Sequence, residues 1–249
     1  MVPAFKLFID FDGTISRSDT TDLILEQFAD RQWQRIEDEW IAGRIGSREC
    51  LRQQTELIHA SPAQLDAFAS AVEIDASFLS VLIACRATQT PVAIVSDGFD
   101  RVIHRVLARH GIRDIPVFAN HLHPHSSNRW QLSFPNATAA CDAGVCKCDV
   151  ASADQCSFVF VGDGRSDFCV VSNAALIFAK ASLADHCRQV GLPFISFNSL
   201  GVVADWLLSI TQPQPASGDQ PWTAPSFPSP KILADAERLS SMKKLSSAR

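Results

Sequence analysis

The chain has 249 residues, 47% of them hydrophobic and 20% charged, and a formal net charge of -5. This length and apolar content support one domain with an insertion or two small domains. The acidic balance without a basic block argues against nucleic acid as a partner, the lack of a long apolar run argues against a membrane span, and the lack of a signal-peptide pattern makes a cytoplasmic protein the expectation.

The first predicted element is a buried strand over residues 5–11, which carries a pair of aspartates at its end. Its almost continuous apolar run is typical of a strand covered on both faces of a parallel sheet. Alternate side chains of a strand point the same way, so Asp10 and Asp12 can converge where the strand ends. Two buried carboxylates repel each other, and Mg2+, which prefers oxygen ligands, would stabilise them. A solvated turn with two aspartates is the alternative interpretation.

The segment after this strand, residues 16–87, predicts mainly helices, because its apolar residues recur at helical spacing without strand-like alternation. Within it, Ser61 followed by Pro62 is a typical helix start. A helical segment of this length is too long for an ordinary crossover connection. We therefore predict an all-helical cap domain over 16–87, inserted between two parts of a core domain, 1–15 and 88–211.

The rest of the core alternates between predicted strands and helices. This alternation predicts an α/β fold with a doubly wound parallel sheet of the Rossmann-like type. Such sheets bind ligands at the carboxyl ends of their strands. The predicted strands cover residues 91–96, 116–119, 157–161, 175–179 and 194–197, the predicted helices cover 99–110, 167–173, 182–190 and 200–210, and a hairpin is expected over 121–134.

Residues 212–249 form a distinct C-terminal segment. Its first part mixes six prolines with serine, glycine and glutamine, a composition typical of linkers. Its last part, residues 231–249, can form a short amphipathic helix. We predict a flexible proline-rich tail, whose role the sequence leaves open.

Three of the eight cysteines, Cys141, Cys146 and Cys148, surround Lys147. Their spacing differs from the repeated C-x2-C pairs of a typical zinc site. In a cytosolic protein we expect these thiols to be reduced. A metal site and a disulfide formed under oxidation stay open as alternatives.

Four motifs follow one another along the chain, three of them directly behind an apolar strand. They are the aspartate pair DFDGT, a strand-ending serine at Ser96, Lys147 ahead of a helical stretch, and GDGRSD, which contains Asp163 and Asp167. Their order and spacing resemble those of the haloacid dehalogenase superfamily of phosphohydrolases over residues 5–208. The phosphoserine-phosphatase-like branch is the most similar part of that superfamily, and its methionine-salvage phosphatases share the cap-and-core order.

The resemblance implies a phosphatase that works through a covalent intermediate. Asp10 would attack phosphorus in line and form an aspartyl-phosphate. Asp12 would protonate the leaving group and then activate water, and it distinguishes phosphatases from dehalogenases, which lack this second carboxylate. Ser96 would hydrogen-bond a phosphoryl oxygen, and Lys147 would neutralise charge on the nucleophile and the phosphate.

Mg2+ is the cofactor that the resemblance implies. The Asp10 side chain, the Asp12 backbone carbonyl and Asp163 would bind it. Asp167 would support the metal through water. Carboxylate, carbonyl and water oxygens are the ligands that Mg2+ prefers.

The substrate is expected to be a small phosphorylated metabolite, with Thr14 and Gly98 at its phosphate end. In phosphoserine phosphatases, a glutamate nine residues after the nucleophile and an arginine on a cap helix recognise the amino acid. This chain has Asp19 and Gln54 at those positions, although a one-residue slip would bring Arg52 into play. Because glutamine cannot form a charged carboxylate clamp, we predict weak activity on phosphoserine and a preference for the enol- or keto-phosphate of methionine salvage.

Other functions stay open from the sequence. Phosphoethanolamine and phosphocholine are the next candidates, with Asp19 or Asp97 facing the cation. Phosphoserine is the next alternative substrate after these two. A catalytically idle binding or regulatory protein of the same fold is the alternative from a different class, although the presence of Asp10, Asp163 and Lys147 disfavours it. A homodimer is compatible with each of these functions.

Overall fold

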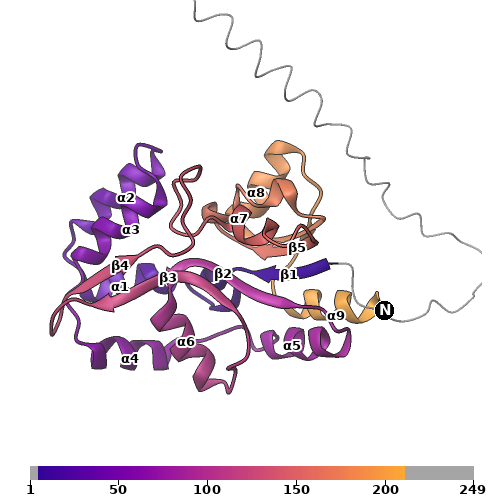
Figure 1. Cartoon of the computed structure of the whole chain (residues 1–249), viewed down its shortest axis with the longest axis horizontal. Helices are drawn as coiled ribbons and strands as arrows, with labels where there is room; N and C mark the ends of the chain where they lie inside the picture. The colour runs from indigo at the N-terminus through magenta and orange to yellow at the C-terminus, as the bar shows by residue number, and fades with distance from the viewer. Residues whose placement is uncertain (1–4, 211–249) are drawn as a thin grey trace, which may run out of the picture. The chain divides into compact units, whose positions relative to one another are not determined.

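The first strand occupies the middle of a seven-stranded sheet (Figure 1). The computed structural model describes residues 5–210. β1 (Phe5–Ile9) pairs in parallel with β2 (Val92–Phe99) on one side and with β5 (Ser157–Gly162) on the other. The strand order is β4-β3-β2-β1-β5-β6-β7. The chain changes its direction across the sheet between β1 and β5, and such switch points are where doubly wound sheets bind ligands.

The outer strands complete the predicted doubly wound α/β fold, which is confirmed. β3 (Val117–Pro124) pairs in parallel with β2, and β6 (Leu176–Ala179) and β7 (Ile195–Ser196) extend the sheet beyond β5. β4 (Trp130–Ser133) pairs antiparallel with β3, as the predicted hairpin requires. The predicted short strand 116–119 and the first arm of the hairpin form one continuous strand, β3.

Helices cover both faces of the sheet, and alternate residues of β1 pack toward opposite faces. Leu7 and Ile9 belong to one hydrophobic cluster and Phe8 to a second one. This is why the first strand is apolar at nearly every position. On one face lie α5 (Phe78–Ala87), α6 (Asp100–Arg109) and α9 (Gly201–Ser209), and on the other lie α7 (Lys147–Ser152) and α8 (Ala181–Val190) (Figure 1).

The segment between β1 and β2 is helical, as predicted. It begins with α1 (Thr20–Phe28), α2 (Trp33–Ile41) and α3 (Ser47–Glu56). α4 (Pro62–Ala71) follows, and Ser61 starts it with a reciprocal capping box. α4 packs against α6 and α5 packs against α9, whereas α2 packs against α3. The last two helices of the segment thus contact helices of the core, and the division into a core and a cap over 16–87 stays a prediction.

Two local predictions about the strand ends differ from the structure. β1 ends at Ile9, and residues Phe11–Ile15 form a tight turn. The predicted helix over 167–173 is wrong, because two short 3-10 turns, Arg165–Asp167 and Val171–Asn173, take its place. The Asp167 side chain accepts hydrogen bonds from the backbone amides at the start of the first turn and so fixes a tighter path.

Three further predictions concern features outside the sheet. The proline-rich tail over 212–249 lies outside the described residues. Within residues 5–210, no helix has the length and apolar character needed to cross a membrane. All eight cysteines lie within that range, and each is a free thiol.

Candidate active site

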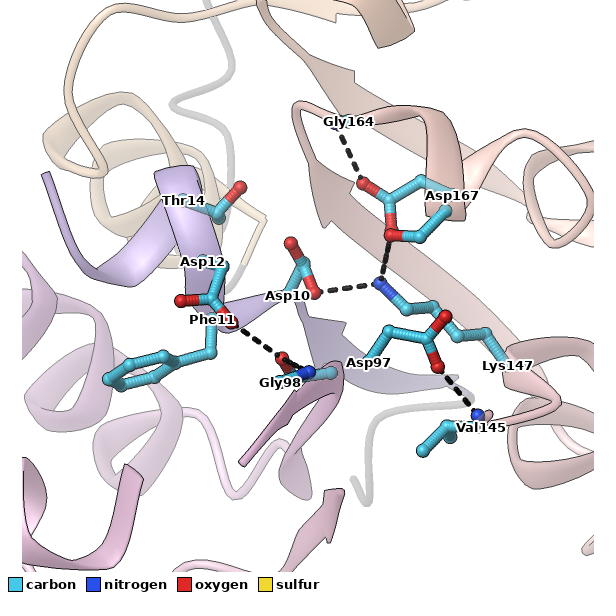
Figure 2. Close-up of polar contacts among 12 residues, drawn as sticks. Asp10, Phe11, Asp12, Thr14, Asp97, Gly98, Val145, Lys147, Gly164 and Asp167 are labelled. Carbon is cyan, nitrogen blue, oxygen red and sulfur yellow. Dashed lines mark hydrogen bonds and ion pairs between the residues drawn. The ribbon is translucent and has the colours of Figure 1, made fainter. Parts of the chain in front are cut away.

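Asp10 and Asp12 lie directly after β1, on either side of Phe11 (Figure 2). The chain turns sharply here, because Gly13 has a φ of +69°. A Cβ atom at Gly13 would lie 2.4 Å from an oxygen of Asp163. The turn therefore needs glycine for its conformation and for the close approach of β1 to the end of β5.

Asp12 is held by the start of α1 and by β2. One carboxylate oxygen accepts hydrogen bonds from the backbone N–H of Thr20 at 2.8 Å and from its hydroxyl at 2.5 Å. The other oxygen accepts one from the Ser96 hydroxyl at 3.3 Å. Burial and the negative charge of Asp19 raise the pKa of Asp12 to about 7, although the Thr20 hydrogen bonds oppose this shift. A carboxyl group that titrates near neutral pH can both donate and accept a proton.

Lys147 is buried between two carboxylates, with its side chain 1% exposed. Its Nζ atom lies 2.7 Å from Asp10 Oδ1 and 2.5 Å from Asp167 Oδ1 (Figure 2). It also donates to the Ser166 hydroxyl at 3.1 Å. Burial disfavours the ammonium ion, but the charges of Asp10 and Asp167 outweigh burial and raise the pKa of Lys147. Lys147 therefore brings a fixed positive charge against one oxygen of Asp10.

The carboxylates of Asp10, Asp163 and Asp167 form a group of oxygen atoms that lie within 4.8 Å of one another. Burial raises the pKa of Asp10 and of Asp163, so this group has more negative charge than its surroundings stabilise. Hard oxygen donors at this spacing suit Mg2+. The donor set therefore fits the cofactor that the sequence implied.

Asp163 and Asp167 differ in their surroundings. The Thr14 hydroxyl donates to Asp163 Oδ1 at 2.7 Å, which leaves the second oxygen of Asp163 without a hydrogen bond from the described residues. Asp167 Oδ2 accepts from the backbone amides of Asp163 and Gly164, each at 3.1 Å, and its other oxygen accepts from Lys147. Asp163 is thus the more available ligand, and Asp167 holds Lys147 and the loop that carries Asp163.

Ser96 and Gly98 lie at the end of β2. The Gly98 backbone N–H donates to the Ser96 hydroxyl at 2.9 Å, and that hydroxyl points to Asp12. A Cβ atom at Gly98 would lie 2.1 Å from Asp12 Oδ2. Glycine at this position therefore permits β2 to approach the aspartate pair.

A cavity of about 130 Å3 opens over these groups, between the strand ends and helices α1 to α3. The cavity lining does not include Thr14, Lys147 or Asp167. These residues contact the lining carboxylates, Asp10 and Asp163, from behind. The predicted residues that line the cavity are Asp10, Asp12, Asp19, Gln54, Ser96, Asp97, Gly98 and Asp163.

The two predicted cap residues reach the cavity in different ways. Asp19 is the N-cap of α1 and accepts from the Asp22 backbone N–H at 3.0 Å. Gln54 is buried, and its amide nitrogen donates to Glu37 Oε2 at 2.9 Å. Arg52 does not line the cavity, because its guanidinium pairs with Glu49 and Glu56 at the protein surface.

Several cavity residues have no counterpart in the predicted site. Glu37 and Trp40 come from α2, and Arg165 comes from the turn after β5. The Arg165 guanidinium lies 5.5 Å from the centre of the Trp40 ring and donates to the Ile41 carbonyl oxygen at 3.1 Å. Glu37 and Trp40 belong to a predicted helix, where no motif marks them, and Arg165 is a variable position within the motif GDGRSD.

Comparisons with known proteins agree with this arrangement. A family model for haloacid dehalogenase-like hydrolases matches residues 7–172. The chain belongs to this family. Because its curated relatives are phosphatases, this member of the haloacid dehalogenase-like hydrolases is a phosphoric monoester hydrolase.

Two of the similar curated proteins have the same name, 2-hydroxy-3-keto-5-methylthiopentenyl-1-phosphate phosphatase. The one from Brevibacillus brevis is 26% identical and is matched over 83% of this chain and 96% of its own length. The one from Geobacillus kaustophilus is 27% identical, over 83% of this chain and 97% of its own length. The methionine-salvage resemblance within the haloacid dehalogenase-like family is thereby confirmed.

Solved structures confirm the fold. A phospho-aspartyl intermediate analogue of phosphoserine phosphatase aligns with a TM-score of 0.61 at 20% identity, over 81% of this chain and 98% of that protein. A phosphoserine phosphohydrolase-like protein from Francisella tularensis aligns with a TM-score of 0.62 at 16% identity, over 81% of this chain and 99% of that protein. The haloacid dehalogenase-like fold is therefore shared across nearly the whole length of both neighbours.

Proposed function

We propose that this chain is a Mg2+-dependent phosphatase that hydrolyses a small phosphate monoester through an aspartyl-phosphate at Asp10. The observation that carries the proposal is the position of Asp10 at the switch point of the sheet. One of its oxygens is bound to buried Lys147, and the Asp163 carboxylate lies beside it. A carboxylate held in this way can attack phosphorus in line. Bound Mg2+ would supply charge neutralisation for the phosphoryl oxygens, with Asp10, Asp163 and the Asp12 carbonyl as its ligands.

The other residues then divide the work of the two half-reactions. Asp12 protonates the leaving oxygen and afterwards removes a proton from the attacking water, for which a pKa of about 7 is suited. The Ser96 hydroxyl and the backbone near Gly98 bind phosphoryl oxygens, and Lys147 stabilises negative charge as the phosphoryl group transfers. Turnover of p-nitrophenyl phosphate with Mg2+, and its loss in EDTA, tests this function. Absence of turnover by the folded protein would favour the idle binding protein instead.

The metal site leads to a prediction about Asp163. Asp163→Ala should raise the Mg2+ concentration needed for half-maximal activity by about tenfold to a hundredfold, because a main oxygen ligand is lost. Ca2+ should inhibit the wild type, since its larger and looser shell would displace the nucleophile. Mg2+ titrations of p-nitrophenyl phosphate turnover measure both effects. Full wild-type activity in EDTA would contradict the metal assignment.

The acid-base role leads to a prediction about leaving groups. Asp12→Asn should slow hydrolysis of alkyl phosphates about tenfold more than hydrolysis of p-nitrophenyl phosphate, whose leaving group needs little protonation. The measurement is kcat for both substrate types in both proteins. Equal losses for the two types would show that Asp12 does not act as the acid.

The substrate is proposed to be the enol- or keto-phosphate of methionine salvage. Two observations support this proposal besides the names of the relatives. The cavity wall includes Trp40, Cys50 and Leu51, which can pack against an apolar thioether end. Gln54 offers no charge, and Arg165 is already bound to Ile41 and Trp40.

One observation favours phosphoethanolamine or phosphocholine as the second candidate. Asp19, Asp22 and Glu37 all line the cavity. Removal from water together with the charge of a neighbouring carboxylate raises the pKa of Asp19 and of Asp22 to about 6 each. A substrate cation would relieve this repulsion.

The substrate prediction is tested by comparing kcat/KM for the enol-phosphate, phosphocholine, phosphoethanolamine and phosphoserine. We expect the enol-phosphate to exceed phosphoserine by at least about tenfold, because Arg165, the arginine that lines the cavity among residues 5–210, is already bound to Ile41 and Trp40 and is not available as a carboxylate clamp. If the aminoalkyl phosphates lead instead, Glu37→Gln should remove their advantage. A lead for phosphoserine would contradict the assignment and would point to Arg165 as the clamp.

A further inference from the structure

The loop that carries Lys147 has no regular secondary structure to fix its path. No helix or strand occurs between β4, which ends at Ser133, and α7, which begins at Lys147 itself. Yet the Lys147 ammonium must lie within hydrogen-bond distance of Asp10 for its proposed role. The position of Lys147 therefore depends on contacts that other segments make with residues 138–146, which we call the lysine loop.

Asp97 supplies one of these contacts and joins the lysine loop to the cap side of the cavity. Its Oδ1 accepts a hydrogen bond from the backbone N–H of Val145, two residues before Lys147, at 2.6 Å (Figure 2). Its Oδ2 accepts one from the hydroxyl of Ser47, the first residue of α3, at 2.7 Å. Val145 is fully buried. One carboxylate thus bridges the lysine loop and α3.

The first turn of α3 makes a second set of contacts with the lysine loop. Arg48 donates from Nη2 to the Thr138 carbonyl oxygen at 2.8 Å and from Nε to the Ala143 carbonyl oxygen at 3.1 Å. Its backbone N–H donates to the Asp142 carbonyl oxygen at 3.0 Å. A Cβ atom at Gly46 would lie 2.4 Å from the Cβ of Asp142. Helix α3 is therefore seated directly on this loop.

The core side of the lysine loop is packed as closely. A Cβ atom at Gly144 would lie 2.7 Å from the amide oxygen of Asn120. The Asn120 amide nitrogen donates to the Asp97 carbonyl oxygen at 2.6 Å. Asp97 thus binds Val145 through its side chain. Through its backbone carbonyl it binds Asn120, which packs against Gly144. A shift of Asp97 must move the residues that lead into Lys147.

We propose that Asp97 is a positioning residue, which couples the seating of α3 over the cavity to the placement of the Lys147 ammonium against Asp10. The inference rests on the proposed function, because it assigns Asp97 to the step in which Lys147 stabilises the transferring phosphoryl group. Asp97 acts through hydrogen bonds to Ser47 and Val145, so its acceptor oxygens are the required property. Its negative charge also favours the Lys147 ammonium, but less than the charges of Asp10 and Asp167, which remain in every Asp97 variant. This separates it from a residue that recognises a substrate cation.

Three variants separate positioning through hydrogen bonds from recognition of a substrate cation. Each is assayed with p-nitrophenyl phosphate at saturating Mg2+. Asp97→Ala removes both bridges and should lower kcat by about tenfold to a hundredfold, as misplacement of a catalytic group by about 1 Å does. Asp97→Asn should recover kcat to within about threefold of the wild type, because an amide oxygen can accept from Val145 and the amide nitrogen can donate to Ser47. Ser47→Ala removes only the hydrogen bond between α3 and Asp97, and it should raise KM more than it lowers kcat.

A second readout follows the phosphoryl site without turnover. Inhibition by orthovanadate should weaken in Asp97→Ala about in proportion to kcat and recover in Asp97→Asn, because a displaced Lys147 stabilises the anion less well. A merely structural role would lower the folded fraction and leave this inhibition constant unchanged. Arg52→Ala is the matched control on α3, since Arg52 pairs with Glu49 and Glu56 at the surface and does not line the cavity.

The outcomes distinguish this inference from the proposed function. Loss of Mg2+-dependent turnover in Asp97→Ala with recovery in Asp97→Asn supports it. Wild-type kcat in Asp97→Ala would overturn it, and so would an Asp97→Asn protein as slow as Asp97→Ala, because the negative charge would then be the required property. A wild type without turnover would contradict the proposed function itself.

Discussion

Asp10→Asn is expected to be folded and to lose activity by a factor on the order of 10^4 or more, because an amide cannot serve as the nucleophile. The asparagine oxygen can still accept the hydrogen bond from Lys147, so the local structure should persist. Removing one charge from the group formed with Asp163 and Asp167 should also reduce their repulsion. The measurement is kcat/KM for p-nitrophenyl phosphate with thermal unfolding of the same preparation.

Thermal unfolding serves as the control for Asp10→Asn. A melting temperature equal to or above that of the wild type, together with lost activity, places the defect in the chemistry. Near-normal turnover by Asp10→Asn would show that another residue forms the covalent bond or that water attacks phosphorus directly.

Lys147→Met is expected to have the second largest effect, on activity and stability together. The side chain keeps its length and loses its charge, so Asp10 and Asp167 lose the cation that lies 2.7 Å and 2.5 Å from them. Removing one partner from a buried ion group costs about 3 to 5 kcal/mol in the free energy of unfolding. Activity should fall by about 10^3-fold, as it does when a major electrostatic contact to the transition state is removed.

The stability loss in Lys147→Met should depend on pH with a definite sign. Burial already raises the pKa of Asp10 in the wild type while Lys147 opposes the shift, so the variant raises it further. A raised pKa means that the folded state binds more protons than the unfolded state, and acid therefore stabilises the variant. The deficit measured by urea unfolding without Mg2+ should shrink as the pH falls from about 7 to about 5. A deficit that grows over this range would contradict the buried ion group.

The motif residues could be predicted from the sequence because the sheet itself brings them together. Asp10, Ser96 and Asp163 each follow an apolar run, and the carboxyl ends of neighbouring parallel strands must meet at one edge. The order of motifs in the family predicts Lys147. Its geometry could not be predicted, because it depends on the irregular lysine loop and on Asp97, far away in the chain.

The cavity wall formed by helices α1 to α3 could be predicted only in part. The family resemblance predicts Gln54 in the site, and Gln54 does line the cavity. Its hydrogen bond to Glu37 could not be predicted, because it depends on how α2 packs against α3. An amphipathic helix reveals which face is apolar, but not which polar residue at the edge of that face turns toward a ligand. Thr14 is a similar case, since its contact with Asp163 requires the register of β1 with β5.

The most direct test of the account is to trap the covalent intermediate. The wild-type protein with Mg2+ and a rapidly reacting phosphate ester is quenched during turnover and treated with borohydride, which reduces an acyl-phosphate to an alcohol. Tandem mass spectrometry of the peptide that contains residues 5–16 then locates the change, with Asp10→Asn as the control. We predict homoserine at position 10 in the wild type and no reduced residue in the variant. An unreduced Asp10 in an actively hydrolysing sample, or homoserine at position 12 or 163, would contradict the assignment of Asp10 as the nucleophile.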